Sequence, residues 1–66
     1  MDALLLKSGW GYQHESAFGL VFKRATADIP CRYKRPLKPG YVIVTDNDGR
    51  TLHVASDALE VATVAA

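Results

Sequence analysis

This chain of 66 residues has few of the features that stabilise small proteins from outside their hydrophobic core. A domain of this length buries only about 60% of the surface that its unfolded chain exposes, so its core gives marginal stability. The chain has a single cysteine, Cys31, so it cannot form a disulfide within itself. With only two histidines in addition to this cysteine, a four-ligand metal site is hard to assemble. Oligomerisation remains as a source of stability, so we expect a homo-oligomer without metal or cofactor.

Long apolar runs are also missing from the sequence. The run near the start of the chain, residues 3–6, is four residues long, which is far shorter than the core of a signal peptide or a membrane span. A single unpaired cysteine is typical of a reducing compartment. We therefore expect a cytoplasmic protein that has no membrane partner.

The charges are unevenly distributed, although the overall composition is that of an ordinary globular chain. Hydrophobic residues make up 48% and charged residues 23%, with a formal net charge of +1, so disorder is not expected. Residues 23–38 hold six cationic side chains and one carboxylate, whereas residues 39–66 hold one cation and four carboxylates. A basic centre beside an acidic end biases which partners the protein meets.

The last third of the chain has the clearest structural pattern. Residues 41–45 form a β-branched and aromatic run, residues 46–49 favour a turn, and residues 50–55 alternate apolar with polar side chains, which is the pattern of a hairpin. Residues 56–59 then have cap-type side chains and the length of one helical turn. Residues 60–64 resume a strand pattern.

The first half of the chain predicts two further strands and a long loop. Residues 1–7 favour a strand over a helix, because the segment is too short for a stable helix on its own. Residues 8–16 contain two glycines around Trp10 and a polar continuation, which indicates a loop. Residues 17–25 are a strand candidate.

Residues 29–34 are predicted to be an edge strand. Apolar and polar residues alternate there, so the apolar side chains, Cys31 among them, should face inward and the basic ones outward. Pro30 and Pro36 cannot donate hydrogen bonds to a neighbouring strand, which favours a position at the edge of a sheet.

These patterns together predict a mostly β protein in which residues 1–66 form one domain, because no repeat or linker divides the chain. We expect a small SH3-like barrel of about five strands, with a one-turn helix before the last strand. The succession of strand, tight turn, strand, helical turn and final strand resembles the end of SH3-like barrels. The segment from Gly40 to Glu60 is also similar to the end of the plasmid-encoded type II dihydrofolate reductases, and to the C-terminal dimerisation barrel of plasmid partition-type repressors.

The reductase resemblance implies a fold but no catalytic role. In that family a Val-Gln-Ile-Tyr strand lines a pore, and the matching residues in this chain are Leu52, His53, Val54 and Ala55. The two polar groups of the family motif are therefore replaced by His53 and Ala55. The spacing of His14, Cys31 and His53 matches no metal or nucleophile motif either, so we expect a protein that is not an enzyme and has no catalytic residues.

The basic centre of the chain is a candidate binding surface. Cations interleaved with an aromatic side chain are what phosphate contact and base stacking require. If the strands that hold these residues pair as neighbours, their side chains form one patch, which could bind nucleic acid or an acidic protein. The candidate binding residues are Lys23, Arg24, Arg32, Tyr33, Lys34, Arg35 and Lys38. The same pattern is also typical of a solvated edge that prevents aggregation.

The predicted hairpin also suggests a subunit interface. With a four-residue loop, alternate residues of its two strands face the barrel interior. That inward set is Tyr41, Ile43, Leu52 and Val54. The other face leaves Val42 and Val44 beside His53 with nothing in so short a chain to cover them, which favours an interface between copies. Surface valines that need no partner are the alternative.

Trp10 and Tyr12 are candidate contacts for a ligand or a partner. Glycines on both sides of Trp10 favour a loop, and large aromatic side chains are common anchors at interfaces. The alternative is a lid over one end of the barrel. Three functions thus stay open: binding of nucleic acid or an acidic protein, self-association, and an oligomer that holds a small molecule near Trp10, Tyr12 and His53.

Overall fold

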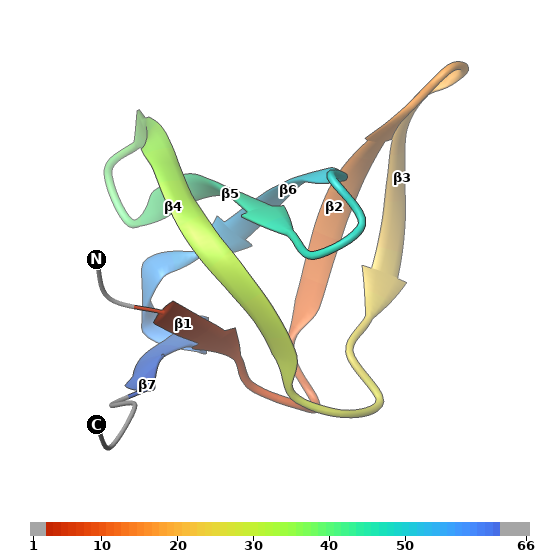
Figure 1. The fold of residues 1–66 in the computed structure, drawn as a ribbon. Helices are drawn as coiled ribbons and strands as arrows, with labels where there is room; N and C mark the ends of the chain where they lie inside the picture. Colours follow the sequence, from red (N-terminus) through yellow and green to blue (C-terminus); the bar gives the residue numbers. More distant parts are fainter. Residues whose placement is uncertain (1–2, 63–66) are drawn as a thin grey trace.

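The computed structural model describes residues 3–62 as one antiparallel sheet with a single turn of 3-10 helix (Figure 1). Its elements are β1 (Ala3–Leu6), β2 (Gly11–Ser16), β3 (Gly19–Arg24), β4 (Ile29–Lys38), β5 (Tyr41–Asp46), β6 (Thr51–Ala55), η1 (Ser56–Ala58) and β7 (Leu59–Ala62). The prediction of a mostly β fold with a helical turn before the last strand is confirmed. Seven strands are described where about five were expected, and the part of the last predicted strand beyond residue 62 lies outside the described residues.

The strand order across the sheet is β3-β2-β6-β5-β4-β1-β7. The two outer strands, β3 and β7, do not pair with each other, so hydrogen bonds do not close the sheet into a barrel. In the part of the chain that the structure describes, no helix has the length and apolar character needed to cross a membrane.

The β5–β6 hairpin turns over residues 47–49. Asp46 organises this turn, because its Oδ1 accepts hydrogen bonds from the backbone N–H groups of Asp48 and Arg50, at 2.9 and 2.8 Å. The backbone N–H of Asp46 also donates to the carbonyl of Arg50 at 3.0 Å. Gly49 has φ near +83°, a conformation that glycine adopts readily. The loop is one residue shorter than predicted, so the register of the hairpin differs as well.

A register change of one residue exchanges the two faces of a hairpin. Val44 lies opposite Leu52 and Val42 opposite Val54, and these side chains pack in the core, with Val44 fully buried. The predicted subunit interface at the two valines is therefore wrong. His53 lies on the other face of the sheet.

Residues 11–16 form β2, so the prediction of a loop there is wrong. β2 pairs with β3 along its whole length and with β6 at Gln13 and His14. Backbone hydrogen bonds extend the β2–β3 ladder beyond the strands, because Ala25 donates to the Trp10 carbonyl at 2.9 Å and accepts from Gly9 at 2.7 Å. Trp10 and Tyr12 therefore belong to a hydrogen-bonded framework rather than to a free excursion.

β4 is not an edge strand, because β1 and β5 lie on either side of it. Pro30 lies opposite Leu5 of β1. Beyond Cys31 the pairing with β1 ends and β4 pairs only with β5, with two register shifts. One shift directly follows Tyr33. Among residues 3–62, no residue of β1 pairs with Tyr33, whose side chain is 54% exposed. Pro36 lies in this half of β4, which pairs with β5 and not with the described residues of β1. Its missing backbone N–H therefore interrupts no pairing with β1.

The core lies on the inner face of the sheet and draws on most of its strands. Its buried members are Leu6, Ala25, Cys31, Val44, Leu52, Val54 and Ala58. Burial raises the pKa of the Cys31 thiol, so this side chain acts as a small hydrophobic group, as predicted. With Ile43, which is 2% exposed, the described residues include eight buried hydrophobic side chains. This is a small core, as expected for a domain of this length.

We predict that Leu52→Ala lowers the free energy of unfolding by about 2–5 kcal/mol, because truncation of a buried leucine removes apolar contacts and leaves a cavity. Leu52 is 2% exposed, whereas Val61 on β7 is 56% exposed. Val61→Ala should therefore change the free energy by less than about 0.5 kcal/mol. Urea unfolding followed by circular dichroism measures both variants. Equal effects of the two substitutions would contradict this placement of the core.

Candidate functional site

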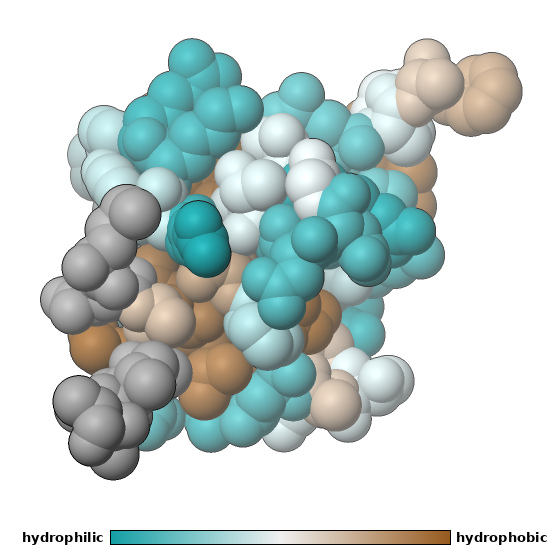
Figure 2. All heavy atoms as spheres, viewed as in Figure 1, coloured by the Kyte–Doolittle hydropathy of each residue, from teal (hydrophilic) through white to brown (hydrophobic). Residues whose placement is uncertain are grey.

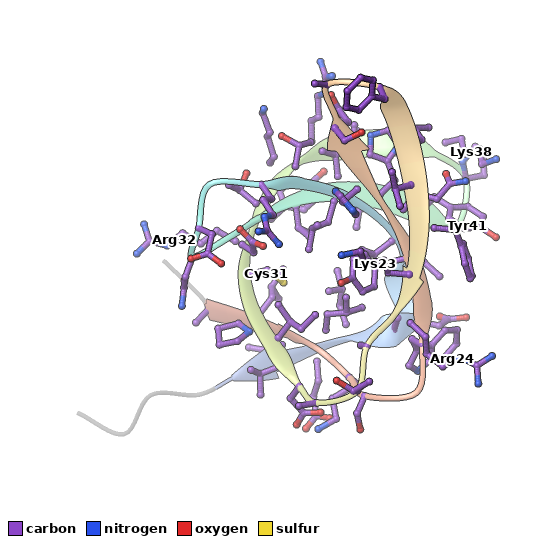
Figure 3. The ribbon with its side chains drawn as sticks, turned by 90° about the vertical axis from the view of Figure 1, so that its right-hand side faces the viewer. Lys23, Arg24, Cys31, Arg32, Lys38 and Tyr41 are labelled. Atoms are coloured by element: carbon purple, nitrogen blue, oxygen red, sulfur yellow. The ribbon has the colours of Figure 1, made fainter. Side chains whose placement is uncertain are left out.

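The basic residues of the centre of the chain do not form one patch. Three strands, β2, β6 and β5, separate β3, which holds Lys23 and Arg24, from β4. Figure 3 shows Arg24 and Lys38 along one side of the molecule and Arg32 on the other side. The prediction that strand pairing joins them is wrong, because it assumed that successive strands are neighbours in the sheet.

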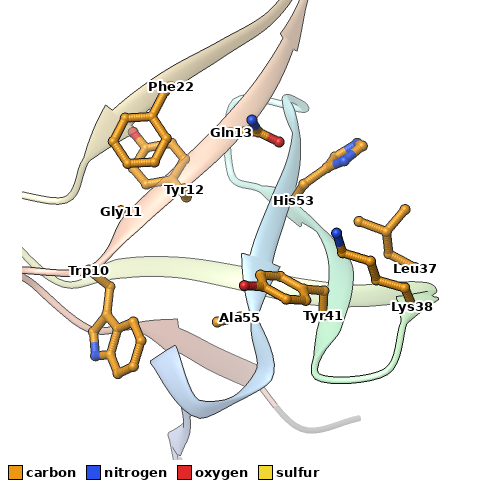
Figure 4. A pocket seen from close by; sticks show the side chains of 10 residues that line it. All are labelled: Trp10, Gly11, Tyr12, Gln13, Phe22, Leu37, Lys38, Tyr41, His53 and Ala55. Atoms are coloured by element: carbon orange, nitrogen blue, oxygen red, sulfur yellow. The ribbon is translucent and has the colours of Figure 1, made fainter.

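A hollow of about 450 Å³ opens on the face of the sheet that carries His53 (Figure 4). β6 crosses its floor, with His53 and Ala55. Aromatic residues of the β2–β3 side form one wall, and residues from the end of β4 and the start of β5 form the other. The full lining is Trp10, Gly11, Tyr12, Gln13, Phe22, Leu37, Lys38, Tyr41, His53 and Ala55.

Two small residues make room for this hollow. Ala55 lies directly opposite Tyr41 in the β5–β6 register, so a methyl group faces the tyrosine across the floor. Gly11 lies beneath Phe22, whose ring occupies the position that a Cβ at Gly11 would take. A larger residue at either position would change the shape of the wall or the floor.

Three aromatic side chains of the hollow are close to half exposed or more. Trp10 is 41%, Phe22 68% and Tyr41 44% exposed. The ammonium of Lys38 lies 4.8 Å from the centre of the Tyr41 ring, within the distance of a cation–π interaction. Among the described residues that line the hollow, none carries a carboxylate. The surface therefore combines flat apolar groups with a positive charge.

The hollow brings together four residues that the sequence had suggested. Trp10 and Tyr12 were candidate ligand contacts, His53 was a candidate interface residue, and Lys38 was one of the candidate basic residues; all four line it. Sequence reasoning missed Phe22, which it placed only within a strand candidate, and Tyr41, which it had assigned to the barrel interior. β3 is an outer strand whose six residues are all exposed, and the shorter β5–β6 loop changes the register that had placed Tyr41 in the interior.

Along the hollow, the imidazole of His53 forms a hydrogen bond with the carboxylate of Glu15. Their side chains approach to 2.9 Å between Nε2 and Oε2, with the histidine 15% exposed. The hydrogen bond from His53 holds the pKa of Glu15 below its ordinary value, and the charges of Lys34 and Arg35 act in the same direction. Lys34 and Arg35 therefore lie close enough to Glu15 for their charges to act on its carboxylate.

Residues 3–62 contain no group of three or more histidine, cysteine, aspartate or glutamate side chains that could hold a metal ion. No family model, curated protein or solved structure matches the chain. The resemblances to SH3-like barrels and to the two plasmid families therefore stay predictions.

We predict that His53→Ala raises the pKa of Glu15 towards its ordinary value, because it removes the hydrogen bond that stabilises the carboxylate. In the native protein this pair contributes stability above the unfolded pKa of Glu15, and the contribution is lost as the pH falls through the lowered folded pKa. NMR titration of the side-chain carboxyl carbons measures the shift. Asp28, whose pKa Lys7 lowers, is an internal control that should not move. A Glu15 titration unchanged by His53→Ala would disprove the pairing.

Proposed function

We propose that this protein is a non-enzymatic binding module for single-stranded nucleic acid, which it takes across the hollow. The observation that carries the proposal is the set of three exposed aromatic side chains, Trp10, Phe22 and Tyr41, around one concave surface without a lining carboxylate. Stacking on aromatic rings is available to every base, because every base has a π-face. The binding should therefore be indifferent to sequence.

The dimensions of the hollow suit a base rather than a duplex. Its volume of about 450 Å³ lies within the range of about 300–1,000 Å³ that is typical of small-ligand sites. Trp10 and Phe22 face it from one wall and Tyr41 from the other. The only helical element among residues 3–62 is the three-residue η1, which is too short to read a major groove. An unpaired strand is the nucleic acid that this surface fits.

Cations lie on both sides of the hollow. Lys38 belongs to its lining, and Arg24 lies opposite Gly11 in the β2–β3 register. A strand whose base stacks in the hollow would carry its phosphates towards these two side chains. The acidic turn at Asp46 and Asp48 is at the far end of β5 from Tyr41, about 17 Å along the strand, so it does not repel phosphate at the hollow.

The hollow carries the proposal better than the group of Arg32, Lys34 and Arg35. Arg32 lies on the other side of the molecule from Lys38, and the charges of Lys34 and Arg35 act on Glu15. Binding of an acidic protein by charge alone would not need the exposed aromatic rings. The loss of affinity when an aromatic ring is removed therefore distinguishes nucleic-acid binding from binding of an acidic protein.

We predict that the protein binds a single-stranded thymidine oligonucleotide and that binding changes the fluorescence of Trp10, the only tryptophan of the chain. Two phosphate contacts on a single strand give a slope of about −1.4 in log K against log salt. Tyr41→Ala should weaken binding by about five- to a hundredfold, because stacking contributes about 1–3 kcal/mol per base. Fluorescence titration at several salt concentrations measures both quantities.

The chain provides matched controls for this experiment. Tyr33 is also an exposed tyrosine, at 54%, but it lies outside the hollow, so Tyr33→Ala should leave the affinity unchanged. Lys38→Ala should reduce the salt slope by about 0.7, whereas Arg32→Ala should not affect it. Absence of binding at low salt, or equal losses from Tyr41→Ala and Tyr33→Ala, would disprove the proposal. Loss with Lys38→Ala but not with Tyr41→Ala would indicate an acidic partner instead.

A further inference from the structure

We propose that β3 is the surface on which two copies of this chain associate, by antiparallel pairing that joins their sheets. β3 is one outer strand of the sheet, and every one of its residues is exposed. The β2–β3 hairpin extends away from the body of the fold, with apolar side chains at its tip (Figures 1 and 2). An edge of this kind is a template for pairing with another strand.

β3 lacks the features that usually protect an edge strand. It contains no proline, and its only charges, Lys23 and Arg24, are at its C-terminal end. Its middle is apolar on both faces, with Leu20 51%, Val21 38% and Phe22 68% exposed. Exposed apolar residues that are contiguous along an edge indicate an interaction surface.

The backbone of β3 is free to form a second ladder. Ala25 donates to Trp10 towards β2, and in an antiparallel pair the residues that bond to one neighbour alternate with those that point away from it. The N–H and C=O groups of Leu20, Phe22 and Arg24 therefore point away from β2. Among the described strands, none pairs with this side of β3.

The sequence of β3 is complementary to itself in the antiparallel direction. Pairing centred on Val21 places Leu20 of each copy opposite Phe22 of the other. It also places Lys23 opposite Gly19, so the cations of the two copies lie at opposite ends of the interface. A parallel arrangement would instead set Lys23 beside Lys23, which is destabilising. A second copy is therefore the partner that this edge fits.

Such pairing closes after two copies, because each β3 meets the other across a two-fold axis. It involves six residues per copy, compared with about 20–30 per partner in a standard interface. We therefore expect a reversible dimer whose population rises with concentration. Val21 pairs with His14 on the face of the sheet opposite the hollow, so the dimer can be tested independently of nucleic-acid binding.

Charge substitutions at Val21 test this pairing directly. In sedimentation experiments the mass of the native protein should rise with concentration from 7.2 kDa towards twice that value. Val21→Lys and Val21→Glu should each stay monomeric, because like charges would face each other at the two-fold axis. An equimolar mixture of the two variants should restore the dimer. Circular dichroism and urea unfolding establish that each variant is folded.

Two controls make the result specific to β3. Val21→Thr keeps the β-branched shape and should still dimerise, and Val61→Lys changes the other outer strand, β7, and should have no effect. The proposal is overturned if the native protein stays at 7.2 kDa at every concentration, or if Val21→Lys still dimerises. Pairing through β3 would likewise be excluded if folded Val21→Lys and Val21→Glu proteins remain monomeric when mixed, or if Val61→Lys dissociates the dimer.

Discussion

The register of the β5–β6 hairpin is the constraint on which the rest of this structure depends. Asp46 and Gly49 close the turn over residues 47–49, and this length places Val44 opposite Leu52. These side chains then fill the core, while His53 and Ala55 line the hollow, where Ala55 also packs against the core. A shift of one residue would reverse the two faces of the hairpin, so the turn decides which side chains fill the core and which line the hollow.

The strand order determines which other residues reach that surface. β2 lies beside β6, so the β2–β3 hairpin forms a wall next to the floor that β6 provides. Among the described strands, β3 has only β2 as a neighbour, which leaves its side chains exposed on both faces and its outer backbone groups without a partner strand. The same topology therefore produces two surfaces: a concave aromatic one on the outer face of the sheet, and an apolar edge suited to a second copy. Because a small core leaves little stability in reserve, pairing at this edge would also help to keep the protein folded.

Local patterns were sufficient to predict the mostly β fold, the turn after Asp46, the helical turn before the last strand and the burial of Cys31. They also pointed to Trp10, Tyr12 and His53 as contact residues. The errors concern long-range pairing, which local patterns do not encode. Alternation of apolar and polar residues leaves the register undetermined when the loop length is misjudged by one residue, and this error moved Val42 and Val44 to the wrong face. Phe22 was not recognised as a contact residue because nothing in its own strand shows that β3 is an outer strand.

The register can be tested most directly by NMR. In an antiparallel pair, residues that do not exchange hydrogen bonds bring their Cα atoms to about 4.5 Å, and their Hα protons give strong cross-strand contacts. Counting from the Asp46–Arg50 hydrogen bond, these pairs are Thr45 with Thr51, Ile43 with His53, and Tyr41 with Ala55. We expect Hα–Hα contacts between these pairs, together with contacts from the Tyr41 ring to the Ala55 methyl group. Contacts of Ile43 with Leu52 and of Tyr41 with Val54 would contradict the register, and with it the position of the hollow.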